Sequence, residues 1–266
     1  MTHPPDAPLK VFITGASSGI GDALATHYAA TGAILGLAAR RGEALAKLAD
    51  GLSAHATSVA SYRLDVTDAA ALHSAADDFM ARFGVPDIVI ANAGVSSGTL
   101  SECAEDLAVI RRILEVNVYG LAATFSPFIA PMRAAAKTGQ PGRLVGIASV
   151  AGIRGLPGAE AYSASKAAAA VYLESLRLEM RASGIRVVTI APGYIATPMT
   201  AVNPYPMPFL LPADEAARRF ARAIARGTSY TVIPWQMGIV AKLLRILPNA
   251  LYDRLFANAP RKPRGL

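Results

Sequence analysis

The feature of this sequence that most restricts its fold is a repeated alternation of short, continuous apolar runs with longer stretches of helical spacing. The first apolar run, residues 10–14, leads into a glycine-rich loop, and a helical pattern follows over residues 20–31. Strands that are apolar at every position are typical of parallel sheets covered by helices on both faces. Right-handed connections then place the ligand crevice at the carboxyl ends of the strands. The sequence therefore predicts an α/β fold with a doubly wound parallel sheet.

The same alternation predicts the bounds of the individual elements. Strands are expected over residues 10–14, 33–39, 58–65, 87–91, 143–149, 185–191 and 230–233. Helices are expected over residues 20–31, 43–52, 69–83, 106–137, 160–182 and 213–226. The fourth of these helices is expected to be interrupted or bent near Ser126-Pro127. Residues 194–212, rich in proline and apolar side chains, are expected to form a substrate lid.

The length of 266 residues suits one large domain and is too short for two catalytic domains, so residues 1–266 are expected to form a single domain. The first ten residues lack the apolar segment of a secretory signal. The single cysteine, Cys103, cannot form an internal disulfide and is interpreted as a small packed apolar group. These observations favour a reducing compartment, and we expect the protein to be cytoplasmic.

The formal net charge of +7 is concentrated at the carboxyl-terminal end. From residue 230 onward, six basic residues oppose Asp253 alone, so this end holds five of the seven net positive charges. The nearly neutral body does not favour nucleic-acid binding. Residues 236–266 are both basic and apolar, and we interpret them as packing over the substrate site or a partner subunit, with peripheral contact to an anionic bilayer as the alternative. Because Lys242 and Arg245 interrupt the apolar stretch, no transmembrane helix is expected.

The loop Thr14-Gly15-Ala16-Ser17-Ser18-Gly19-Ile20-Gly21 stands between the first strand and the first helix. Its glycines permit a tight turn and let a pyrophosphate approach the backbone amides, and the helix amino terminus adds partial positive charge. The alternative is a loop that only needs positive φ angles. Placement directly after the first strand favours dinucleotide binding. The expected cofactor contacts in this loop are Gly15, Ser17, Ser18, Gly19 and Ile20.

The residues after the second strand predict which dinucleotide is bound. Twenty residues past Gly19, where a NAD enzyme usually has a carboxylate for the ribose hydroxyls, stand Ala39, Arg40 and Arg41. A carboxylate would repel a 2′-phosphate, whereas a guanidinium can bind it through charge-assisted hydrogen bonds. We therefore expect NADP(H), with Arg40 as the main contact and Arg41 as a solvated start to the next helix.

Two further strand ends are expected to face the dinucleotide. Asp65-Val66 closes the third strand, where the carboxylate can accept a hydrogen bond from the adenine amino group. Alternatively, Asp65 caps the next helix, with Asp68 as a competing cap. Asn92-Ala93-Gly94 closes the fourth strand, where small residues leave room for the cofactor and the asparagine can tie neighbouring strands together.

The candidate catalytic residues are Tyr162, Lys166, Ser149 and Asn117. Tyr162 and Lys166 lie one helical turn apart, so the ammonium, together with an oxidised nicotinamide, would lower the phenol pKa and allow acid–base catalysis. Ser149 ends the preceding strand and can hydrogen-bond the substrate oxygen, and Asn117 can bend its helix and hold a water linked to Lys166. Taken one at a time, Tyr162 could be a core residue, Lys166 a solvated charge on a helix, and Ser149 a cap at the end of a strand. The placement of all four residues around a phosphate loop favours a catalytic role. No metal is expected.

These motifs resemble those of the classical short-chain dehydrogenase/reductase (SDR) family. The loop from Thr14 to Gly21 looks like the family's cofactor motif, and Asn92-Ala93-Gly94 looks like its strand motif. Tyr162-Ser163-Ala164-Ser165-Lys166 looks like its active-site motif, which Asn117 and Ser149 complete as a tetrad. Pro192-Gly193-Tyr194-Ile195-Ala196-Thr197 resembles the segment that closes over nicotinamide, which implies cofactor contacts at Pro192, Gly193, Ile195 and Thr197.

The resemblance covers roughly residues 10–198. It implies a Rossmann fold with about seven strands, hydride transfer assisted by tyrosinate, and a homodimer or homotetramer. The NADP(H) branch of the family often has a basic residue before the second motif glycine, where this chain has Ser18. Cofactor discrimination must therefore rest mainly on Arg40.

The expected walls of the substrate site, residues 95–100, 150–157 and 194–211, are mostly apolar, and Arg154 is their one charged residue. This favours a hydrophobic or lipid-like carbonyl compound, or its alcohol, as the substrate. A non-catalytic NADP(H)-binding sensor or scaffold is an alternative, because a fold does not guarantee an activity. A sugar-nucleotide epimerase is a further alternative, but the roughly 70 residues after Gly193 leave little room for its substrate domain.

Overall fold

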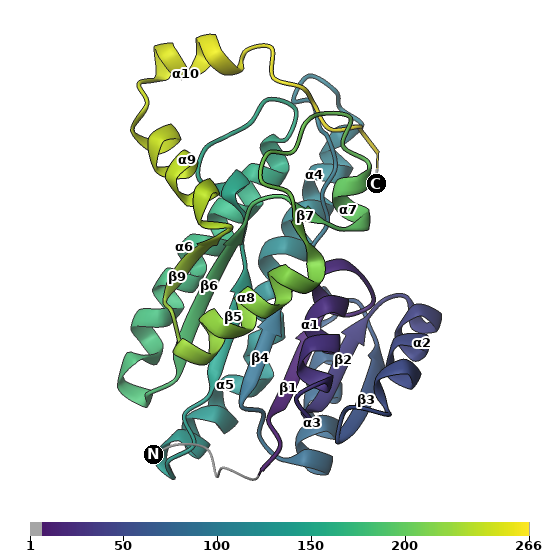
Figure 1. Cartoon of the computed structure of the whole chain (residues 1–266). Coiled ribbons are helices and arrows are strands. Elements are labelled where there is room, and N and C mark those ends of the chain that lie inside the picture. The colour runs from purple at the N-terminus through teal and green to yellow at the C-terminus, as the bar shows by residue number, and fades with distance from the viewer. Residues whose placement is uncertain (1–6, 266) are drawn as a thin grey trace.

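One parallel sheet forms the centre of the computed structural model, which describes residues 7–265 (Figure 1). Every neighbouring pair of strands in it is parallel, as the apolar runs predicted. The strand order is β3 (Ser58–Arg63), β2 (Ile34–Ala39), β1 (Lys10–Thr14), β4 (Ile88–Ala91), β5 (Arg143–Ile147), β6 (Arg186–Pro192) and β9 (Tyr230–Ile233). The order reverses between β1 and β4, so a crevice opens there at the carboxyl ends of the strands.

Helices cover both faces of the sheet, which confirms the doubly wound α/β fold. Alternate side chains of β1 enter different cores, since Val11 and Ile13 pack on one face and Phe12 on the other. The helices on the first face are α1 (Gly19–Ala29), α2 (Gly42–Leu52) and α8 (Ala213–Arg226). The helices on the second face are α3 (Ala69–Phe83), α5 (Gly120–Lys137) and α6 (Glu160–Met180).

The predicted break in the long helix near Ser126-Pro127 is wrong in position. The helical hydrogen-bond pattern of α5 continues through Pro127 and Pro131. The irregular part lies earlier, where a π-helical turn over Glu115–Tyr119 joins α4 (Asp106–Leu114) to α5. A proline removes only its own amide donor, and the buried packing of α5 against the sheet holds the helix together. The π turn inserts one extra residue into a turn and so re-aims the side chains around it.

The continuous helix from Asp106 to Lys137 is also the one helix, among the residues described, that is long and apolar enough by composition to cross a membrane. Half of the most apolar stretch of this helix is buried inside the molecule. Phe125 and Phe128 in that stretch are fully buried in the core beside the sheet. Its apolar character is therefore explained by its place in the core.

The remaining elements lie at the carboxyl ends of the strands. The lid region contains β7 (Ile195–Ala196), α7 (Pro198–Ala201) and β8 (Leu211–Pro212). After β9 the chain continues through α9 (Trp235–Ile246) and α10 (Asn249–Phe256) and returns to the neighbourhood of α7 (Figure 1). Two short 3-10 turns, Val150–Gly152 and Arg181–Ser183, flank α6. The lid and the carboxyl-terminal segment thus stand at the end of the molecule where the crevice opens.

Candidate active site

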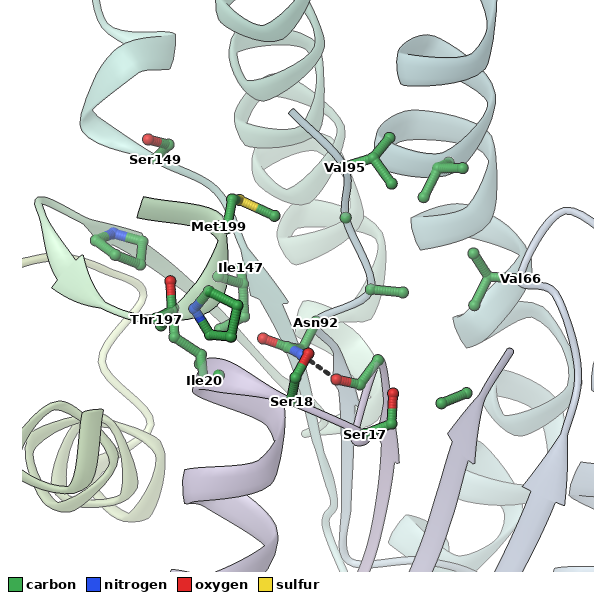
Figure 2. Close-up of a pocket in the computed structure, with 18 of the residues that line it drawn as sticks. Ser17, Ser18, Ile20, Val66, Asn92, Val95, Ile147, Ser149, Thr197 and Met199 are labelled. Carbon is green, nitrogen blue, oxygen red and sulfur yellow. Dashed lines mark hydrogen bonds between the residues drawn. The ribbon is translucent and has the colours of Figure 1, made fainter. Parts of the chain in front are cut away.

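The glycine-rich loop after β1 turns sharply and is held by a neighbouring strand. Gly15 and Gly19 have φ angles of 67° and 59°, which glycine adopts without a steric cost. Asn92, at the end of β4, donates hydrogen bonds of 3.1 Å to the carbonyl oxygens of Thr14 and Gly15, so it ties the two strand ends together as its sequence position suggested. Figure 2 shows Asn92 next to the loop that carries Ser17 and Ser18.

Gly21 is the position in this loop where the backbone is packed most closely. A Cβ atom there would lie 2.2 Å from the Gly15 carbonyl oxygen and 2.6 Å from Asn92 Nδ2. Gly21→Ala is therefore expected to lower the free energy of unfolding by about 1–3 kcal/mol, because backbone atoms must move. It should also weaken dinucleotide binding, since the same backbone forms the phosphate cradle.

Gly51→Ala provides the control for this prediction. Gly51 lies in α2, and nothing lies within 4 Å of a Cβ added there. This substitution is expected to stabilise the protein by about 0.5–1 kcal/mol. Urea denaturation measures the free energy of unfolding of both variants, and fluorescence titration measures their NADPH affinity. Equal stability and equal NADPH affinity of the two would contradict the role given to the close packing at Gly21.

A pocket of about 420 Å³ runs along the carboxyl ends of the strands, within the range of small-molecule sites. Ser149 lines it at one end, and the glycine loop lines another part (Figure 2). The structure brings every residue expected to contact the cofactor to this one pocket. These residues are Gly15, Ser17, Ser18, Gly19, Ile20, Arg40, Asp65, Val66, Asn92, Ala93, Gly94, Tyr162, Lys166, Pro192, Gly193, Ile195 and Thr197.

Two arginines line the pocket beyond the end of β2. Arg40 is largely exposed, and its guanidinium approaches Asp65 at 3.9 Å. Arg41 was expected to be a solvated helix start, but its guanidinium donates to the hydroxyl and the carbonyl oxygen of Ser17 at 3.2 Å. Both cations and the Ser17 hydroxyl therefore surround one corner of the pocket. This corner of the pocket therefore combines positive charge with several hydrogen-bond donors.

Arg112 is a member of this region that sequence reasoning missed. It projects from α4, and its guanidinium forms an ion pair with the Asp65 carboxylate. The other carboxylate oxygen accepts hydrogen bonds from the backbone and the hydroxyl of Thr67. Burial tends to raise the pKa of Asp65, but these partners hold it below the usual value. Asp65 is thus paired mainly with Arg112, and the exposed Arg40 guanidinium lies at the outer limit of an ion pair with the same carboxylate.

The alternative role of Asp65 as a helix cap is excluded by the geometry. Asp68 is the residue before α3, and its carboxylate accepts a hydrogen bond of 3.0 Å from the Ala71 amide. This is the usual geometry of an N-cap. Asp65 instead faces the pocket, where it remains a candidate for the adenine contact.

Tyr162, Lys166 and Ser149 converge at the other end of the pocket. Lys166 is almost fully buried, and its ammonium donates a 2.8 Å hydrogen bond to the Ile147 carbonyl oxygen at the end of β5. The ammonium lies 5.9 Å from the centre of the Tyr162 ring. The Ser149 hydroxyl accepts a hydrogen bond from the Ala151 amide and also interacts with the Tyr162 hydroxyl. A serine, a phenol and an amine therefore share one small space beside the crevice.

Asn117 lies behind this group, in the π turn, and does not line the pocket. Its side-chain amide pairs with both backbone groups of Val95 and donates a 2.9 Å hydrogen bond to the Ser165 hydroxyl. Ser165 in turn donates to the Tyr162 carbonyl oxygen. Asn117 thus connects the end of β4 to the helix that carries the tyrosine. The proposed water link to Lys166 stays a prediction.

Burial dominates the protonation of the two central groups. It raises the pKa of Tyr162, which the nearby Ser149 hydroxyl partly offsets, and it lowers the pKa of Lys166 to about 8. The expected lowering of the phenol pKa requires Lys166 together with an oxidised nicotinamide, and it stays a prediction; in the protein by itself, desolvation of the phenolate raises this pKa. In this environment Tyr162 is protonated at neutral pH and can donate a hydrogen bond.

The lowered pKa of Lys166 leads to a prediction about stability. Below pH 8 the amine is charged in both the folded and the unfolded protein. Between pH 8 and 10.5 the unfolded chain still binds the proton that the folded protein has released, so folding becomes more favourable as the pH rises. The difference between the two pKa values corresponds to about 3 kcal/mol across this window.

Lys166→Met provides the comparison, because it removes this titration. Denaturant unfolding of both proteins between pH 7 and 10.5 measures the difference. The wild-type free energy of unfolding, minus that of the variant, should increase by about 3 kcal/mol over this range. Parallel pH profiles would show that the lysine has an ordinary pKa in the folded protein.

A strap formed by residues 261–265 lies across the substrate end of the crevice. Lys262 donates hydrogen bonds of 3.1 Å to the Ser96 hydroxyl and to the Met199 carbonyl oxygen, so it joins the loop after β4 to the lid. Arg264 pairs through two nitrogens with the buried carboxylate of Asp106. Sequence reasoning missed these contacts, because a basic terminal segment has no periodicity that indicates its path. Arg154 is therefore not the only cation near the expected substrate walls.

The described residues contain no group of three or more His, Cys, Asp or Glu side chains that could hold a metal ion. The functional groups that line the pocket include the Tyr162 phenol, the Lys166 amine, the Ser149 hydroxyl and the backbone of the glycine loop. A Cβ atom at Gly15 would lie 2.7 Å from the Ala93 backbone, so the missing side chain allows the loop to pack against the end of β4. The residues present fit a nicotinamide dinucleotide.

Comparison with known proteins agrees with this geometry. A protein-family model described as short chain dehydrogenase matches residues 10–205. The chain is 39% identical over 241 residues to an uncharacterized oxidoreductase of Myxococcus xanthus, covering 91% of this chain and 93% of that protein. It is 32% identical to dehydrogenase/reductase SDR family member 7B of Bos taurus, covering 96% and 82%. A crystal structure of a short chain dehydrogenase/reductase from Burkholderia phymatum in complex with NAD superposes with a TM-score of 0.81 at 26% identity, covering 99% and 100%.

Proposed function

The chain belongs to the short-chain dehydrogenase/reductase family of oxidoreductases, which act on alcohol and carbonyl groups, and from this we propose that it is an NADP(H)-dependent enzyme for hydrophobic carbonyl compounds and their alcohols. The observation that carries the proposal is the convergence of Tyr162, Lys166 and Ser149 on the pocket that also contains the glycine loop. A fold alone would not indicate an activity, whereas this group of side chains can perform one.

A nicotinamide dinucleotide held by the glycine loop and the pocket residues would supply the hydride chemistry of the proposed reaction. Tyr162 donates a proton to the carbonyl oxygen in reduction and removes it in oxidation. The Ser149 hydroxyl orients that oxygen by a hydrogen bond. Lys166 holds positive charge near the phenol and stabilises the phenolate that remains. Asn117 positions the tyrosine helix through Ser165.

The preference for NADP(H) is supported by the two guanidinium groups of Arg40 and Arg41 at one corner of the pocket. Their charge suits a 2′-phosphate, and Arg112 keeps the neighbouring Asp65 carboxylate paired. Cofactor contacts are assigned to the pocket residues given above, with the phosphates at the amino terminus of α1.

A hydrophobic substrate is supported by the groups around Tyr162. Val95 and Met199 line the same pocket as Ser149 (Figure 2). The Arg154 guanidinium instead donates to the carbonyl oxygens of Leu244 and Leu247. Lys262 is already bonded to Ser96 and Met199. A lipid-like ketone, aldehyde or secondary alcohol suits such walls better than a phosphorylated sugar. A cytoplasmic homodimer or homotetramer completes the proposal.

The test is net oxidation of NADPH, followed at 340 nm, with a panel of aliphatic, aromatic and steroid-like ketones and long-chain keto-lipids. The proposal expects turnover with at least one apolar carbonyl, and faster turnover with NADPH than with NADH. NADPH binding without any oxidation across the panel would indicate a sensor or scaffold. An enzyme that converts a sugar nucleotide without net NADPH consumption would be an epimerase.

A further inference from the structure

The outer face of α9 exposes four large apolar side chains in one row. Trp235, Ile239, Leu243 and Ile246 are 65%, 51%, 57% and 77% exposed. Their spacing of four, four and three residues places them on one side of the helix. We call these four side chains the outer stripe of α9. Single exposed apolar residues are normal, but a contiguous row of this length marks a contact surface.

The opposite face of α9 is already packed against the protein, so the helix cannot rotate to hide the outer stripe. Met237 and Ala241 are buried. The carbonyl oxygen of Leu244 accepts a hydrogen bond from Arg154, and Arg245 donates to the Ile153 carbonyl oxygen. These contacts fix which side of the helix faces the protein. The outer stripe therefore remains available to a partner.

The next helix, α10, is anchored in the same manner and also leaves apolar side chains outside. Tyr252 is buried, donates a hydrogen bond to the Gly155 carbonyl oxygen and lies 4.0 Å from the Arg154 guanidinium carbon. Leu251 and Leu255 are 47% and 62% exposed. One side of α9 and of α10 thus contacts the loop after β5, and the other side exposes large apolar side chains.

The charge of this segment indicates what covers it. Asp253 is the one acid after residue 230, against six basic residues, and Lys242 lies in the row beside the outer stripe. Within α9 and α10 themselves, the basic residues Lys242, Arg245 and Arg254 oppose Asp253 alone, so two copies face to face would bring net positive charge against net positive charge. This disfavours a second protein copy as the occupant. A surface of anionic phospholipid has the opposite charge and takes apolar side chains below its headgroups.

We propose that α9 and α10 form a docking surface for an anionic phospholipid bilayer. α9 has 12 residues and is about 18 Å long, which is shorter than the roughly 30 Å of a bilayer core. It therefore lies in the plane of the interface and does not span it. The crevice opens at this end of the molecule, so a docked protein holds its substrate entrance close to the lipid (Figure 1).

Trp235 provides a direct test, because it is the one tryptophan of the chain. Its fluorescence is expected to shift to shorter wavelength when vesicles of phosphatidylcholine with phosphatidylglycerol are added to the full-length protein. Brominated lipid should quench it. Vesicles of phosphatidylcholine alone should have little effect, and high salt should reverse the shift. An emission spectrum unchanged by anionic vesicles overturns the proposal, whether or not the protein is active.

A flotation assay with matched variants completes the experiment. Ile239→Glu/Leu243→Glu is expected to reduce co-flotation with the anionic vesicles at least tenfold. The control is Ala46→Glu/Ala70→Glu, which adds the same charges at exposed positions on α2 and α3 and should float like the wild type. Circular dichroism checks that each variant is folded, and light scattering gives its mass. Equal flotation of both variants, or a change of mass specific to the α9 variant, overturns the proposal; the latter would identify a second protein copy as the occupant.

Discussion

Tyr162→Phe is expected to lower kcat by about 10²–10⁴-fold while leaving NADPH affinity unchanged. The substitution keeps the aromatic ring, which is partly buried in the pocket wall, and removes only the hydroxyl that would exchange a proton with the substrate oxygen. Without that proton, an alkoxide would have to form in a largely desolvated site. The rate of NADPH oxidation at saturating substrate, together with NADPH titration by fluorescence, measures the two effects separately.

Tyr172→Phe is the matched control, because Tyr172 lies on the same helix and packs against the core away from the pocket. It should retain wild-type turnover. If Tyr162→Phe keeps turnover within tenfold of the wild type, the proton must come from another group, and the proposed mechanism is wrong. Loss of NADPH binding in this variant would mean that the hydroxyl supports the cofactor site instead.

Arg40→Asp is expected to lower kcat/KM for NADPH by about 10–100-fold and to reverse the preference toward NADH. A hydrogen bond to a charged group contributes about 1.5–3 kcal/mol, and the new carboxylate would also repel the 2′-phosphate. The same carboxylate can accept hydrogen bonds from the ribose hydroxyls of NAD(H). Initial rates with both cofactors over a range of concentrations give the ratio of the two kcat/KM values.

The control for charge alone is Arg82→Asp, since Arg82 pairs with Asp78 on the surface of α3 and does not line the pocket. This variant has the same change in net charge and should keep the wild-type cofactor ratio. An unchanged ratio in Arg40→Asp would transfer the discrimination to Arg41, whose guanidinium is already bonded to Ser17. Arg41→Ala would then show the loss of NADPH preference.

The fold could be predicted from local patterns because each strand carries its own signature. The apolar runs that became β1 and β9 have the predicted bounds, and α3 and α8 begin and end at the predicted residues. A strand that is buried on both faces must be apolar at every position, and a covering helix must be apolar on one side, so both signals are local. The proline near residue 127 misled the prediction, because buried packing tolerates its missing hydrogen bond.

Most of the candidate site followed from the same patterns. In a parallel sheet all carboxyl ends lie along one edge, so residues at the ends of β1, β4 and β5 were bound to meet. The spacing of four residues likewise predicted that Tyr162 and Lys166 lie on the same face of a helix. The pKa values of Tyr162 and Lys166 could not be predicted in this way, because desolvation depends on all the atoms that surround each group in the folded protein.

The parallel sheet and the residues that gather at the crevice could be predicted from the sequence, since they depend on short-range periodicity and on chain direction. The family could be predicted because its motifs are short and contiguous in the chain. Three features could be found only in three dimensions: the pairing of Arg112 with Asp65, the link from Lys262 to Ser96 and Met199, and the four apolar side chains on the outer face of α9. Such pairings join residues far apart in the chain. Their energies depend on distances in space, and no local pattern of residues encodes those distances.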